Sequence, residues 1–85
     1  MAGTAHSPEY REFVALLVAA RKDFGLSQAQ LAIRLGKPPS FVAKYELVER
    51  RLDVLEFVIV CKAIGVDPVS VFKEVVLSLP DGSAL

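Results

Sequence analysis

The residues between positions 25 and 36 constrain the fold of this 85-residue chain more than any others, because they carry both ends of one short helix. Ser27 and Gln30 have the spacing of a capping box, in which each side chain hydrogen-bonds to the backbone N–H of the other residue. Gly36 follows the last apolar position, where a left-handed residue without a Cβ closes a helix at low cost. The sequence therefore predicts a helix over about 27–35.

A second short helix is expected directly after the first. Pro38 and Pro39 prevent the first helix from continuing, because the residue before a proline is pushed out of the helical region. The next helix then covers about 39–47. Two helices joined by so short a turn form a helix-turn-helix, whose second helix can lie in the major groove of DNA.

These residues resemble the Cro and lambda-repressor (Xre-like) type of helix-turn-helix domain. The resemblance covers about 10–72, and its several matches in the right order are more specific than one short motif. It implies an all-α, compact five-helix lambda-repressor-like domain that binds double-stranded DNA and regulates transcription. The matching residues are Arg21, Gly25, Leu26, Ser27, Gln28, Leu31, Ala32, Leu35, Gly36, Val42, Glu46, Arg50, Arg51, Ala63, Ile64, Gly65 and Val66.

Three further helices are predicted from apolar residues that recur every three or four positions and from the signals at their ends. Only one domain is expected from a chain of this length, over residues 8–79, with a flexible N-terminus over 1–7 and a flexible tail over 80–85. The signals are Ser7, Pro8 and Gly25 for the first helix, Asp53, Glu56 and Gly65 for the fourth, and Asp67, Pro68 and about Leu79 for the fifth.

Composition narrows the class of protein further. No apolar run approaches the ~20 residues that cross a bilayer, and the chain begins without a secretory signal, so a cytoplasmic protein is expected. Cys61 and His6 each occur once, so no disulfide, metal site or other cofactor is expected. Without a nucleophile and base at useful spacing, the sequence favours a protein that is not an enzyme.

Charge is distributed unevenly, although the net charge is zero and the pI is about 6.6. Residues 21–51 contain seven basic and three acidic side chains, whereas the rest of the chain contains three basic and seven acidic ones. Local rather than total charge governs the attraction to phosphate. The basic half is therefore expected to face DNA; the alternative is an ordinary solvated helix surface.

By the resemblance, the start of the second helix-turn-helix helix reaches the base edges, through Pro39, Ser40, Phe41 and Lys44. Lys44 can donate to guanine, and Ser40 suits either base type. Pro39 has no side-chain donor or acceptor where the family often has a polar residue, which weakens direct readout. Phe41 is expected on the exposed side, against a thymine methyl group, with packing on the preceding helix as the alternative.

Phosphate contacts are expected from Gln28, at a helix N-terminus that favours anions, and from Lys37 in the turn. Arg50 and Arg51 follow the second helix and would clamp the DNA backbone. The alternative for Gln28 is a surface glutamine without a partner. The alternative for Arg50 and Arg51 is a solvated loop.

Arg21 and Glu46 are assigned to structure rather than to DNA. In the family that the chain resembles, this pair bridges the first helix to the end of the DNA-reading helix, where a forked contact fixes its angle. An exposed acid facing phosphate would instead repel it. Glu46 as a catalytic acid would lack a second carboxylate or a histidine at useful spacing.

Val48 stands where the family commonly has glycine. A left-handed β-branched residue costs of order 1–2 kcal/mol, so we expect a different turn or a longer third helix there.

Apolar residues exceed what one small core needs, since 53% of the chain is hydrophobic and the fourth helix is apolar on all sides around Ile59. A homodimer is expected, because it would set two DNA-reading helices about one DNA turn apart. The alternative is a protein-interaction regulator, antiactivator or antitoxin-like, with weak or no DNA binding. Either partner would use Ile59, Val71, Val75, Val76 and Leu79.

Overall fold

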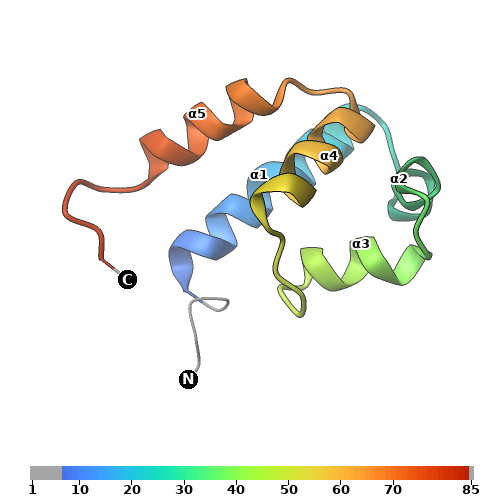
Figure 1. Ribbon diagram of the computed structural model, residues 1–85, viewed down its shortest axis with the longest axis horizontal. Coiled ribbons are helices and arrows are strands. Elements are labelled where there is room, and N and C mark those ends of the chain that lie inside the picture. The colour runs from blue at the N-terminus through green and yellow to red at the C-terminus, as the bar shows by residue number, and fades with distance from the viewer. Residues whose placement is uncertain (1–6, 85) are drawn as a thin grey trace.

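The computed structural model describes residues 7–84, and within that range it contains five helices and no strand (Figure 1). This confirms the predicted all-α fold with five helices. The expectations for residues 1–6, including His6, and for residue 85 lie outside the described residues. The helices are α1 (Pro8–Asp23), α2 (Gln28–Leu35), α3 (Pro39–Glu46), α4 (Val54–Ile64) and α5 (Pro68–Ser78).

Both predicted capping boxes are present. The Ser27 hydroxyl accepts from the Gln30 N–H at 3.0 Å, and the Gln30 side chain accepts from the Ser27 N–H at 2.8 Å. At the start of α4, the Asp53 carboxylate accepts from the Glu56 N–H at 2.7 Å, and Glu56 accepts in return at 3.0 Å. These bonds satisfy N–H groups that a helix leaves without an internal partner.

The hydrophobic core lies between α1, α2, α3 and α4. Its fully buried side chains include Leu17 of α1, Leu31 of α2, Tyr45 of α3 and Val60 of α4. In Figure 1, α5 runs along one edge of the molecule while α3 lies at the opposite edge. Val71 is the one α5 residue that the core buries, so most of the surface of α5 stays exposed.

Val48 has a left-handed backbone with φ of 62°, so the expectation of a different turn or a longer third helix was wrong. The Val48 N–H donates to the Tyr45 carbonyl at 3.1 Å, and the Glu49 N–H donates to the Lys44 carbonyl at 2.8 Å. This is the Schellman pattern that also closes α2 at Gly36. The Val48 side chain is buried, and that burial offsets the strain of the left-handed residue.

Candidate nucleic-acid interface

Three of the residues expected to contact bases lie on the exposed face of α3. Pro39, Ser40 and Lys44 are exposed, and Ser40 and Lys44 are one helical turn apart on the same face. Leu47, at the end of this face, is 65% exposed and was not predicted as a contact. Its position three residues after Lys44 places it on the same side of the helix.

A buried ion pair sets the position of α3. Arg21 of α1 reaches Glu46 of α3 through two bonds, Nε to Oε2 at 2.7 Å and Nη2 to Oε1 at 3.0 Å. Its Nη1 donates to the Leu26 carbonyl at 2.7 Å, in the loop before α2. Hydrogen bonding to Glu46 raises the pKa of Arg21, so the guanidinium stays charged. One side chain thus joins α1, α3 and the loop before α2.

Gln28 belongs to the same network. Its side-chain amide donates to Glu46 Oε1 at 2.8 Å, so the alternative of a surface glutamine without a partner was wrong. This bond links the N-terminus of α2 to the end of α3. A phosphate at this place would meet the positive end of the α2 dipole, because helix N-termini favour anions.

Phe41 does not project from the exposed side of α3, contrary to the first expectation. It lies one turn before buried Tyr45, so it shares the inward face of the helix and packs half-buried against the core. Its ring meets that of Tyr45 edge-on at 5.9 Å. Lys37 Nζ lies 5.7 Å from the centre of the Phe41 ring, and Arg50 Cζ lies 4.8 Å from it.

Arg50 and Arg51 are exposed residues of the loop after α3, and both side chains also make contacts within the protein. Arg50 makes a forked pair with Glu56, Nη2 to Oε2 at 2.6 Å and Nη1 to Oε1 at 3.1 Å. Arg51 Cζ lies 4.9 Å from the centre of the Tyr10 ring. The Arg50 guanidinium holds the pKa of Glu56 at about 2, well below its usual range. Sequence reasoning missed this pair, because six residues across a loop imply no contact.

Comparison with known proteins decides the family. Residues 17–71 match the model of a helix-turn-helix family. The chain belongs to the Cro/C1-type helix-turn-helix family, or XRE family. A solved structure, an XRE-family like protein from Pseudomonas syringae pv. tomato str. DC3000, is 44% identical, with a TM-score of 0.83. The match covers 91% of this chain and 94% of that chain.

A search of the curated proteins finds no match. The XRE chain is a DNA-binding regulator of that type, built on a fold that is typically non-enzymatic. In the described part of the chain, no group of three or more His, Cys, Asp or Glu side chains could hold a metal ion. No helix in residues 7–84 is long and apolar enough to span a membrane.

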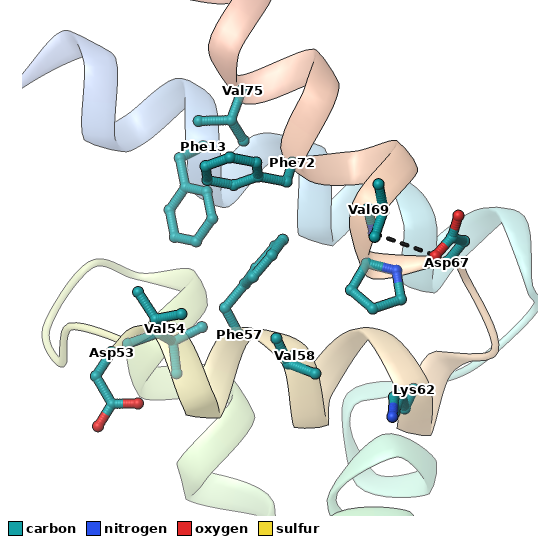
Figure 2. A pocket seen from close by; sticks show the side chains of 12 residues that line it. Phe13, Asp53, Val54, Phe57, Val58, Lys62, Asp67, Val69, Phe72 and Val75 are labelled. Atoms are coloured by element: carbon teal, nitrogen blue, oxygen red, sulfur yellow. Dashed lines mark hydrogen bonds between the residues drawn. The ribbon is translucent and has the colours of Figure 1, made fainter.

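An apolar groove is lined by residues of α1, α4 and α5 (Figure 2). Its volume is about 650 Å³, and Phe57 of α4 lies at its centre, 5.5 Å from the Phe13 ring and 6.5 Å from the Phe72 ring. Val69 and Phe72 were not predicted as surface residues, although their three-residue spacing places them on one face of α5.

The expected interface residues divide into two groups. Ile59 is 57% exposed and Val76 is 53% exposed, Leu79 is also exposed, and Val75 lines the groove. Val71 is buried in the core, so its assignment to an interface was wrong. The error arose because Val71 and Val75 share one face of α5, and the first turn of that face packs on the core.

Proposed function

We propose that this XRE chain is a sequence-specific transcriptional regulator that binds as a homodimer and inserts α3 into the major groove of a pseudo-palindromic operator. The observation that carries the proposal is the α3 face of Ser40 and Lys44, which is exposed while the opposite face is held by the Arg21–Glu46 pair. A reading helix that is already held at a fixed angle does not have to be ordered on binding, which lowers the entropic cost of association.

Ser40 and Lys44 supply the base contacts. Lys44 suits guanine O6 and N7, and Ser40 donates to or accepts from either base type. Pro39 adds only van der Waals contact. Phe41 is left out of the base contacts, because its ring is half-buried and lies beneath Arg50.

Backbone contacts come from both ends of the helix-turn-helix. Gln28 begins α2, Lys37 lies in the turn after α2, and Arg50 and Arg51 follow α3. Contacts to phosphate fix the register of the protein on the duplex but carry no sequence information. These residues therefore strengthen the binding of every DNA sequence by about the same amount.

The second copy docks on the exposed apolar surface of α4 and α5. Exposed side chains on these two helices include Ile59, Phe72, Val76 and Leu77, each at least half exposed. Several large apolar side chains exposed on one small domain favour an interaction site. A twofold pairing through it would leave both α3 helices accessible, because α3 and α5 lie at opposite edges of the molecule (Figure 1).

The test of DNA reading is a titration of labelled genomic fragments followed by fluorescence anisotropy at low and at physiological salt. Lys44→Ala should weaken the preferred fragment about 10-fold or more and leave non-specific binding nearly unchanged. Lys73→Ala on α5 removes the same charge far from α3 and is the matched control. Absence of any bound fragment at low salt contradicts the proposal.

The test of the dimer is the mass in solution, by light scattering. Ile59→Asp should convert the dimer to a monomer, because it places a charge in the apolar interface. Ile33→Asp on α2 is the matched control, since Ile33 is also exposed but lies outside the patch. A wild-type chain that is monomeric at high concentration contradicts the dimer.

A second candidate function is a protein-interaction regulator on the same fold, antiactivator or antitoxin-like. The apolar groove between α1, α4 and α5 favours it, since such a groove can hold an apolar segment of another protein. Co-purification with a defined partner, lost in Val69→Asp, an exposed residue that lines this groove, and kept in Lys44→Ala, would support this function over the first.

A further inference from the structure

Glu56 uses both carboxylate oxygens on Arg50. Arg50 Nη2 and Nη1 donate to Glu56 at 2.6 and 3.1 Å, and Nη1 also donates to the Arg51 carbonyl at 3.0 Å. These three bonds occupy three of the five N–H donors of a guanidinium. A phosphate that approaches Arg50 therefore meets a guanidinium with only part of its N–H donors available, and the Glu56 carboxylate lies beside it.

A second cation lies over the same aromatic ring as Arg50. Lys37 and Arg50 lie over the same Phe41 ring, although one precedes α3 and the other follows it. The charge of Lys37 also favours the ionised form of Glu56. We call Lys37, Phe41, Arg50 and Glu56 the Phe41 cluster. Within it, one carboxylate pairs with Arg50 and is attracted by the charge of Lys37, and these are two of the four residues proposed to contact phosphate.

We infer that Glu56 is a charge-balancing residue of the DNA interface, which lowers the affinity of the Phe41 cluster for phosphate. This inference rests on the proposed DNA binding. Neutralisation of a phosphate releases counterions in proportion to the net cationic charge supplied. Arg50 paired with Glu56 supplies almost no net positive charge to a phosphate. Without that partner, Arg50 supplies close to one unit of positive charge.

The structural role of Glu56 does not require its charge. Glu56 also accepts from the Asp53 N–H at 3.0 Å to complete the capping box of α4. Glutamine serves equally at this position of a capping box, so Glu56→Gln keeps the cap and removes only the charge. The pair itself stabilises the fold little, because the Arg50 side chain is 41% exposed.

The experiment measures the affinity of wild type and Glu56→Gln for one duplex between 50 and 200 mM monovalent salt. Glu56→Gln should bind more tightly, with a salt slope steeper by about 0.9 per bound protomer. The advantage of the variant should therefore be about 3.5-fold larger at 50 mM than at 200 mM salt, per protomer. Glu74→Gln, an exposed site on α5, is the matched control and should leave the slope unchanged.

A double variant shows whether Glu56 acts through Arg50. In an Arg50→Ala background, Glu56→Gln should change the slope by less than half as much, because the cation that it would release is absent. Circular dichroism of each variant verifies that α4 is folded.

The outcomes distinguish a failure of the proposed DNA binding from a failure of the proposed role of Glu56. If wild type binds no DNA at low salt, the proposed function fails. If wild type binds and Glu56→Gln has the same slope, or binds more weakly, the charge-balancing role is overturned while DNA binding stands. An equal slope change in the Arg50→Ala background also overturns it.

Discussion

Val48 offers a direct measurement of backbone strain, because a β-branched residue holds a left-handed conformation at the end of α3. Its side chain is 6% exposed and lines a shallow hollow together with Val14 and Val18 of α1. Two effects therefore oppose each other at one residue. Burial of the side chain stabilises the fold, and the left-handed backbone destabilises it.

The two effects can be separated by comparing alanine and glycine substitutions. Val48→Ala removes about 1.6 kcal/mol of burial and keeps a Cβ in the left-handed region. Val48→Gly removes about 0.8 kcal/mol more burial but relieves strain of about 1–2 kcal/mol. The glycine variant should thus be more stable than the alanine variant, by between about 0.2 and 1.2 kcal/mol.

Val60 is the matched control, since it is also buried but lies inside α4 with helical backbone. There glycine loses the same ~0.8 kcal/mol of burial and a further ~1 kcal/mol of helix propensity. Val60→Gly should therefore be less stable than Val60→Ala by about 1.8 kcal/mol.

Urea unfolding of the four variants, followed by circular dichroism at 222 nm, gives the free energies of unfolding. The decisive quantity is the glycine-minus-alanine difference at each site. If that difference has the same sign and size at Val48 as at Val60, the left-handed strain is refuted. Equal m-values across the variants are required for the comparison, because a changed m-value indicates a changed denatured state.

Two other predictions concern buried and charged groups. Tyr45→Phe should raise the free energy of unfolding by up to about 1 kcal/mol, because the Tyr45 hydroxyl is buried and the described residues give it no hydrogen-bond partner; a loss above 1 kcal/mol in urea unfolding would contradict this. The folded-state pKa of Glu56 is lowered from 4.5 to about 2. Stability from its ion pair, about 1 kcal/mol or less at this partly exposed site, should therefore be full above pH 4.5 and fall as the pH drops towards 2. Glu56→Gln should flatten that part of the acid unfolding curve, and an unchanged curve would count against the pair.

The elements of this fold could be predicted because their signals are local. Ser27 and Gln30 are three residues apart, and so are Asp53 and Glu56, and each pair makes both hydrogen bonds of its capping box. Gly36 has the left-handed backbone that a helix end favours. Such signals act within one helical turn, so the sequence shows both members together.

Val48 could not be predicted in the same way, because a local penalty competes with a tertiary gain. The penalty is visible in the sequence, as a valine at a glycine position. The gain depends on the position of α1, more than 20 residues earlier in the chain. Phe41 shows the same limit, since only the packing of α3 decides which of its faces points inward.

A count of charged residues along the sequence overstates the positive charge of the proposed DNA interface. A count over residues 21–51 gives a basic surplus of four. Glu56 lies outside that range but pairs with Arg50 inside it, so the surplus around α3 is three once the partner is included. The charges of Arg21 and Glu46 also cancel, but both residues lie within 21–51, so the surplus of four already includes them. Because the salt dependence of DNA binding follows net neutralised phosphates, the slope should correspond to the smaller surplus. If the measured salt slope instead corresponds to the surplus of four, DNA binding separates Arg50 from Glu56.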